Sequence, residues 1–143
     1  SLRELDGTAC RRLIRSYVIS NNIYRGEIMS EIKHVPTPFS YSSAVVAGDY
    51  AFLSFHRGFG NSFAEQLNGA ILGMQKTLEE LNLPLSSIVK VTVWLKNIQD
   101  LPFMEKQFLD YFEPTKCPAR MTATTEFFDS DCLVMIEGIA FCK

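Results

Sequence analysis

The sequence predicts an α+β domain in which one mixed β-sheet carries two helices on a single face. Its 143 residues, of which 47% are hydrophobic, match the size and apolar content of about one globular domain. Two helical patterns alternate with strand-like runs in the order strand–strand–helix–strand–helix–strand–strand. Only the N-terminal extension is left within the chain to cover the second face of the sheet, so we expect copies of the chain to associate through it.

A β-hairpin is the first element that the pattern predicts. Two runs of strand-forming residues, 44–47 and 50–55, are separated by Gly48-Asp49, a two-residue connection typical of a hairpin turn. Pro36 comes shortly before them, and we expect it to break any regular element at that point. The glycine-containing stretch after the second run is expected to be a loop.

The first helix begins with a capping box, since Ser62 is followed three residues later by Glu65. Apolar residues then recur on one face as far as Leu81. Gly69 and Gly73 lie inside this helix, and each costs roughly 1 kcal/mol relative to alanine. We therefore expect another backbone segment to approach the helix closely at these glycines.

The second half of the domain repeats the alternation of strand and helix. Residues 88–96 alternate apolar and polar side chains, as a half-buried strand does. A second helix is expected to begin at Asp100, a good N-cap residue, with Pro102 tolerated in its first turn. The last two predicted strands are 119–125 and 133–141.

The charge is distributed unevenly along the chain. Residues 1–33 hold six basic and four acidic residues (+2), which leaves eight basic and twelve acidic residues (−4) of the 14 and 16 in the chain. The body has no basic run that would neutralise phosphates, so a nucleic-acid partner is not expected. No apolar run approaches the roughly 18 residues of a membrane helix. We interpret residues 1–30 as an N-terminal extension and residues 31–143 as the domain.

The cysteines give no metal-binding pattern. They are scattered, without a C-x-x-C pair, at Cys10, Cys117, Cys132 and Cys142. A structural zinc site is therefore not expected. Without a secretory signal pattern we expect reduced thiols and a cytoplasmic protein, and the arginine-rich start makes a mitochondrial location the weaker alternative.

Arg120 and Glu137 are the two charged residues that stand out in apolar surroundings. Arg120 opens a strand of small and apolar residues, and its planar guanidinium suits bidentate capture of a carboxylate. Glu137 lies inside the apolar last strand, where a buried carboxylate needs a partner. Two interpretations remain open: an ion pair, within one chain or between subunits, that joins Glu137 to Arg120 or a lysine, and an anion-binding site.

Ser54 and His56 are the other candidates for chemistry. They are two residues apart and share a strand face if the strand continues. No acidic residue is in a position to complete a catalytic triad, so an exposed strand end is the favoured interpretation.

Several of these residues also belong to motifs that resemble a known family. The chain resembles the reactive intermediate deaminase family (Rid/YjgF, also called endoribonuclease L-PSP) from about Glu31 to Cys142. The motifs that carry the resemblance are Tyr41–Val45, Ser54, Ile88–Leu95, Cys117–Arg120 and Ile136–Ala140. The resemblance implies a chorismate-mutase-like fold, a homotrimer and three clefts between subunits.

The resemblance also implies an activity that needs neither cofactor nor metal. Family members hydrolyse enamine and imine intermediates such as 2-aminoacrylate to 2-oxo acids and ammonia. Arg120 would hold the carboxylate of the substrate, which agrees with its physical interpretation as an anion-binding residue. The other residues that the resemblance implicates in catalysis or substrate binding are Tyr41, Ser54, Phe55, Glu105, Thr122 and Glu137.

The chain departs from the family pattern at positions that matter for catalysis. Phe55 replaces the glycine of an S-G-Q segment, and Glu105 replaces a frequent asparagine. The last strand usually carries two glutamates, but here the first is Met135 and only Glu137 remains. Methionine cannot accept a proton, so His56 is an alternative base, since an imidazole titrates near neutral pH.

Three functions therefore stay open, and whether the chain is an enzyme is uncertain from its sequence. The first is hydrolytic deamination of imines and enamines. The second is a catalytically weakened trimer that binds small carboxylates or keto acids, which the loss at Met135 favours. The third is an endoribonuclease or translation inhibitor, which the acidic body disfavours.

Overall fold

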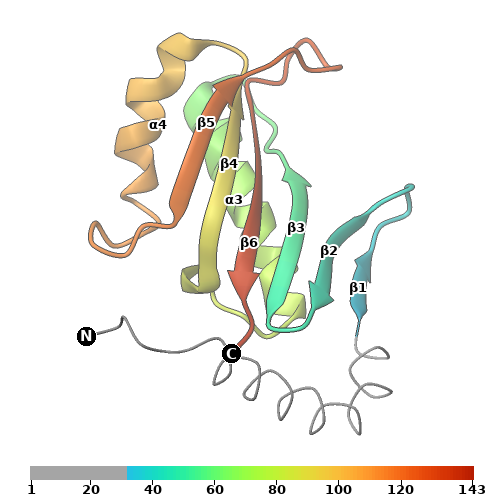
Figure 1. Ribbon diagram of the computed structural model, residues 1–143. Coiled ribbons are helices and arrows are strands. Elements are labelled where there is room, and N and C mark those ends of the chain that lie inside the picture. The colour runs from blue at the N-terminus through green and yellow to red at the C-terminus, as the bar shows by residue number, and fades with distance from the viewer. Residues whose placement is uncertain (1–31) are drawn as a thin grey trace, which may run out of the picture. The chain divides into compact units, whose positions relative to one another are not determined.

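The computed structural model describes residues 32–143, and the predictions on residues 1–30 lie outside this part of the chain. Its core is a six-stranded mixed sheet with the strand order β1-β2-β3-β6-β4-β5 (Figure 1). The strands are β1 (Lys33–Pro36), β2 (Ser42–Ala47), β3 (Tyr50–His56), β4 (Ile88–Leu95), β5 (Ala119–Thr124) and β6 (Val134–Phe141). The helices are α3 (Phe63–Glu80) and α4 (Leu101–Phe108), with short 3₁₀ turns at Leu85–Ser87 and Ile98–Asp100.

Two crossover connections explain why both helices cover the same face. Helix α3 leads from β3 to β4, which both run antiparallel to β6 between them. Helix α4 leads from β4 to its parallel neighbour β5. Both crossovers advance toward the β5 edge, so two connections of the usual right hand bring their helices to one face. The predicted α+β sheet with its two helices is confirmed.

One apolar core lies between the helices and the sheet. Alternate residues of β4 point into it, so Val91, Val93 and Leu95 are buried while Thr92 and Trp94 belong to the opposite, open face. The largest fully buried side chains from the helices are Leu67, Ile71, Met74, Leu78 and Met104. A long helix face and three central strands therefore provide most of the apolar burial that stabilises the fold.

Two strand predictions need correction. Residues 33–36 form β1, although Pro36 was expected to exclude regular structure. A proline is tolerated there because β1 is an edge strand and Pro36 is its last residue, next to a register shift. In β4 the alternation begins late, since the register shifts between Ile88 and Lys90 and leaves Val89 exposed.

The helix starts follow the sequence in one case and depart from it in the other. The Ser62 hydroxyl accepts the backbone N–H of Glu65 at 3.2 Å, as predicted, and Glu65 Oε2 accepts the N–H of Asn61 at 2.8 Å. Asp100 makes no side-chain capping bond, because the 3₁₀ turn Ile98–Asp100 already gives it a helical backbone. The predicted capping role of Asp100 is therefore wrong, although the helix begins at the expected place.

The two glycines of α3 have different neighbours. A Cβ at Gly69 would lie 2.7 Å from the Cα of Gly58 in the loop after β3, so the backbones do approach closely there. A Cβ at Gly73 would meet only the His56 ring, at an ordinary 3.6 Å. The prediction of a close backbone is confirmed at Gly69 and wrong at Gly73.

Candidate functional site

Arg120 lies on β5, at the edge of the sheet, and faces the helices. It pairs in register with the buried Val91, which fixes the side of the sheet to which it points. Its Nε donates to Thr122 Oγ1 at 3.1 Å, and its Nη2 donates to Glu105 Oε1 on α4. The guanidinium carbon lies 5.3 Å from the centroid of the Phe108 ring, a cation–π distance.

These contacts hold the guanidinium in place without closing it off. The Arg120 side chain stays 26% exposed, and the Glu105 side chain is 53% exposed. Within residues 32–143 Nη1 has no hydrogen-bond partner. The structure thus brings three of the sequence-predicted residues together, Arg120, Thr122 and Glu105, which we call the Arg120 site.

Glu137 does not join this site. It pairs with Thr92 across the sheet and therefore lies on the open face, opposite to Arg120. Glu137 is exposed, and it lines a small hollow of about 260 Å³ that also includes Lys90 and Thr92. The hypothesis of an Arg120–Glu137 ion pair within one chain is wrong, because one residue faces the helices and the other faces away from them.

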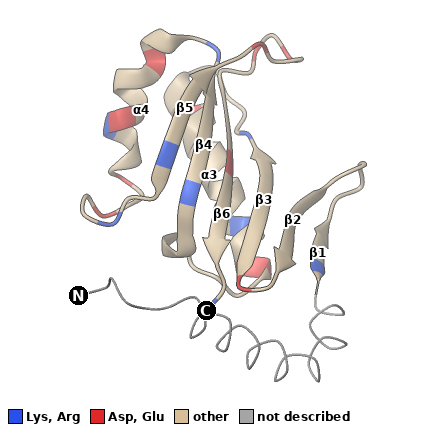
Figure 2. Ribbon diagram, in the orientation of Figure 1, with Lys and Arg blue, Asp and Glu red and all other residues tan. Residues whose placement is uncertain are grey.

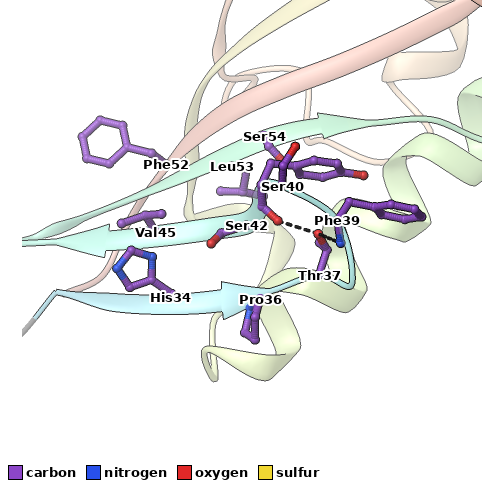
Figure 3. A pocket seen from close by; sticks show the side chains of 11 residues that line it. His34, Pro36, Thr37, Phe39, Ser40, Ser42, Val45, Phe52, Leu53 and Ser54 are labelled. Atoms are coloured by element: carbon purple, nitrogen blue, oxygen red, sulfur yellow. Dashed lines mark hydrogen bonds between the residues drawn. The ribbon is translucent and has the colours of Figure 1, made fainter.

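Tyr41 belongs to a second group of residues near the opposite edge of the sheet. The loop between β1 and β2 and the strand β3 enclose a hollow of about 590 Å³ (Figure 3). Thr37 organises this loop, because its hydroxyl donates to the Tyr41 carbonyl and accepts the Phe39 N–H. The Tyr41 ring stacks on Phe39 with centroids 6.1 Å apart and contacts Phe55 at 5.2 Å.

Ser54 lines the same hollow, where a bulge in β3 sets its position. The pairing of β3 with β6 shifts between Leu53 and His56, so Ser54 and Phe55 are not paired regularly. The Ser54 hydroxyl donates to the Ser43 carbonyl at 3.3 Å. We call the surface formed by Thr37, Phe39, Tyr41 and Ser54, together with Phe55, whose ring packs against Tyr41, the Tyr41 hollow.

His56 points away from the Tyr41 hollow and toward α3. Its Nδ1 lies 2.8 Å from the Ser54 carbonyl and its Nε2 lies 2.8 Å from the Thr77 hydroxyl. The carbonyl can only accept, so Nδ1 carries the proton and neutral Nε2 accepts from Thr77. Burial lowers the pKa of His56 from 6.5, and the hydrogen bond to Ser54 opposes this effect. The expected shared face of Ser54 and His56 is lost because the bulge interrupts the strand.

One copy of the chain does not bring the two groups of residues together. The strand order places β6 and β4 between β3 and β5, a distance of about 14 Å at ordinary strand spacing. Arg120 and Tyr41 lie still farther apart in the sheet, because Tyr41 precedes β2 on the far side of β3. A site that uses both residues therefore needs more than one copy.

Sequence reasoning missed several residues that shape these surfaces. Phe108 appeared only as a buried residue of the second helix, and nothing in its spacing linked it to Arg120. Thr37 and Phe39 lie in the segment that follows Pro36, which was expected only to lack regular structure. A threonine two residues before an exposed aromatic residue, next to two prolines, was the available signal for an ordered turn.

The match to a known family covers almost all described residues. The model of the family described as "Endoribonuclease L-PSP" matches residues 32–142. The chain belongs to this family. This assignment agrees with the resemblance of the motifs Cys117–Arg120 and Ile136–Ala140 to the Rid/YjgF family.

Relatives of this L-PSP family chain match it over nearly their whole length, and a solved structure shares its fold. A RutC family protein of Pyrococcus horikoshii is 29% identical over 118 residues, which cover 76% of this chain and 93% of the relative. A protein of Dermatophagoides farinae, named 2-iminobutanoate/2-iminopropanoate deaminase, is 26% identical over 125 residues, covering 78% and 97%. The crystal structure of a YjgF family member from Neisseria meningitidis superposes with a TM-score of 0.75 at 22% identity, covering 79% and 96%.

The part of the L-PSP family chain that the structure describes shows neither a cluster of metal ligands nor a membrane-spanning helix. Across residues 32–143, no three His, Cys, Asp or Glu side chains gather as a metal site would require. No helix between the same limits is long and apolar enough to cross a membrane.

Proposed function

We propose that the chain is a hydrolytic deaminase of reactive imines and enamines that carry a carboxylate. The observation that carries this proposal is the Arg120 guanidinium, which is held by Thr122 and Phe108 yet remains partly exposed with one nitrogen unpaired. Such a group binds a small carboxylate in a fixed orientation. The deaminase name of the Dermatophagoides farinae relative supports the same chemistry.

The proposed active site lies between copies in a homotrimer. The Arg120 site of one copy would face the Tyr41 hollow of the next, since a single copy keeps them on different parts of the sheet. In this arrangement Tyr41, Ser54 and Phe55 form the wall against which the substrate lies. The open face of the sheet would be covered by the same association.

The proposed reaction follows from the electrophilic nature of the imine carbon. Arg120 holds the carboxylate next to this carbon and exposes the carbon to water. Water adds to the carbon and gives a carbinolamine, and a proton passes from the added water to the nitrogen through solvent. Collapse breaks the carbon–nitrogen bond, so that one imine and one water yield one 2-oxo acid and one ammonia. We assign His56 a positioning role, because both of its ring nitrogens already have partners.

Ammonia release tests the proposal directly. We expect the chain to accelerate ammonia formation from 2-iminobutyrate that a threonine dehydratase produces in the assay. Arg120→Ala should reduce this acceleration at least about tenfold, because it removes a hydrogen bond to a charged group. Lys116→Ala is the matched control, since Lys116 is a basic residue that is 76% exposed and, among residues 32–143, pairs only with Glu113. Equal rates for Arg120→Ala and the control would contradict the proposal.

A second candidate function is the binding of small carboxylates or keto acids without turnover. Met135 favours it, because the open-face position opposite Trp94 lacks the carboxylate that would activate water. The same assay separates the two candidates. Turnover no faster than the spontaneous rate, together with Arg120-dependent binding of 2-oxobutyrate, would support the binding function.

An endoribonuclease role, which the family description carries, remains the least favoured candidate. Outside residues 1–33 the chain holds eight basic and twelve acidic residues of the 14 and 16 in all. Figure 2 shows Lys and Arg scattered singly over the elements of residues 32–143. Ribonucleic acid binding relies on clustered positive charge that neutralises phosphates.

A further inference from the structure

Glu105 binds one of the Arg120 guanidinium nitrogens that a carboxylate ligand would need. Arg120 Nη2 donates to Glu105 Oε1, and Nε donates to Thr122 Oγ1. A carboxylate that binds a guanidinium bidentately uses two of its nitrogens, so at this site it competes with Glu105 for Nη2. The Glu105 side chain is 53% exposed and lies at the surface of α4, where it can change rotamer without disturbing the core.

The Arg120–Glu105 ion pair also determines the net charge of the surface to which a ligand binds. The negative charge of Glu105 offsets the positive charge of Arg120, so a simple monoanion meets both an attraction and a repulsion. A ligand with a carboxylate beside a cationic nitrogen meets two attractions, its carboxylate to Arg120 and its nitrogen to Glu105. In a protonated 2-imino acid the nitrogen is bonded to the carbon next to the carboxylate, which places the two charges side by side.

We propose that Glu105 is a specificity-determining residue of the Arg120 site, which selects zwitterionic 2-iminium carboxylates over monoanionic 2-oxo acids. This inference rests on the proposed deaminase function. It has a consequence for turnover, because hydrolysis removes the cationic nitrogen as ammonia. The product 2-oxo acid then leaves Glu105 without a cation to bind, and Glu105 returns to Arg120 and displaces it.

Stable probes test this selection on the full-length chain. L-2-aminobutyrate serves as the zwitterion and 2-oxobutyrate as the monoanion, and their dissociation constants are measured by NMR titration. We expect the wild-type chain to bind L-2-aminobutyrate more tightly. Glu105→Gln should shift the ratio of the two constants about fivefold toward 2-oxobutyrate, the factor that corresponds to loss of a partly exposed ion pair.

Two control variants make the result specific. Glu113→Gln removes an acidic charge of the same kind from a residue whose side chain is 70% exposed and paired with Lys116, and it should leave the ratio unchanged. Glu105→Asp keeps the charge and should keep the preference for the zwitterion. An unchanged ratio in Glu105→Gln would overturn the inference, and so would a wild-type chain that binds neither probe or prefers 2-oxobutyrate.

The test of Glu105 as a specificity-determining residue can fail independently of the test of the deaminase function. Arg120-dependent ammonia release with an unchanged probe ratio would reject only the role of Glu105. The expected probe ratio without ammonia release would reject the deaminase and leave Glu105 as a selector of zwitterionic ligands.

Discussion

His56 connects a titratable ring to the geometry of the Tyr41 hollow. Its Nδ1 holds the Ser54 carbonyl, and its Nε2 reaches Thr77 on α3. The ring therefore fixes the bulge that carries Ser54 and Phe55. Protonation would place a second N–H on the ring, at Nε2, so the Thr77 hydroxyl would have to accept a hydrogen bond instead of donating one. The positive charge that protonation adds would be largely buried.

The pH dependence of stability should report this arrangement. Burial lowers the pKa of His56 below 6.5, so as pH falls through that value the unfolded chain binds a proton before the folded chain does. The free energy of unfolding therefore decreases as pH falls below about 6.5, and it is unaffected by His56 at higher pH. Urea unfolding between pH 5 and 8 should show a smaller decrease in His56→Gln than in the wild type.

His34 provides the matched control, because it is the other of the two histidines and is exposed on β1. His34→Gln should keep the wild-type decrease in stability. If His56→Gln and His34→Gln had the same pH profile, the linkage to His56 would be rejected.

The sequence predicted individual residues less well where their role depends on contacts with residues far away in the chain. The isolated charge of Arg120 was visible in the sequence, and so was the departure at Glu105. The sequence did not reveal that these two residues form the ion pair, because that depends on how α4 lies against β5. The incorrect pairing of Arg120 with Glu137 arose from the same gap, since the faces of two separate strands are set by sheet register.

At the scale of elements, the contact between α3 and the loop after β3 depends on two glycines. Gly58 and Gly69 approach so closely that a Cβ on either would lie 2.7 Å from the Cα of the other. A Cβ on Gly58 would also lie 2.2 Å from the Gln66 carbonyl oxygen. The buried Gln66 side chain donates to the carbonyls of Gly60 and Asp131, so it links this loop to the one before β6.

Alanine substitutions at the two glycines of α3 should have opposite effects. Gly69→Ala should lower the free energy of unfolding by about 1–3 kcal/mol, because its Cβ would push two backbones apart. Gly73→Ala should raise it by up to about 1 kcal/mol, because it improves helix propensity and its Cβ meets the His56 ring at ordinary contact distance. Urea unfolding measures both, and a stabilising Gly69→Ala would contradict the close approach.

Local signals predicted most elements of the fold, and non-local pairing accounts for the errors. The capping box at Ser62 and the apolar periodicity of α3 are properties of short segments, and both predictions hold. β1 was missed because its four residues form a strand only by pairing with β2. The exposed Val89 follows from a register shift that the pattern of one strand does not contain.

At the scale of the whole molecule, the open face of the sheet carries large apolar side chains. Phe52 is 47% exposed and Met121 is 62% exposed, and both belong to this face by their register with Ile139 and Thr92. Tyr50 and Phe141 add a further aromatic contact at 5.6 Å. Exposed apolar side chains of this size are typical of an interface.

A charge on the open face should therefore disrupt the proposed trimer. Phe52→Lys is expected to convert it largely to monomers, because the association would bury an unpaired ammonium group. Size-exclusion chromatography with light scattering measures the change. Leu72→Lys is the control, since Leu72 is similarly exposed, at 50%, but lies on the outer surface of α3. A monomeric wild type, or a trimeric Phe52→Lys variant, would reject this surface as the interface.

The position of β6 in the sheet has a consequence for how the domain is made. β6 is the last strand in the chain but lies at the centre, where it pairs with β3 on one side and β4 on the other. During synthesis the hairpin of β2 and β3 and the β4–α4–β5 unit emerge first, with no strand to join them. The two halves of the sheet stay unjoined until residues 134–141 have been made, so this domain completes its fold only after its last strand is available.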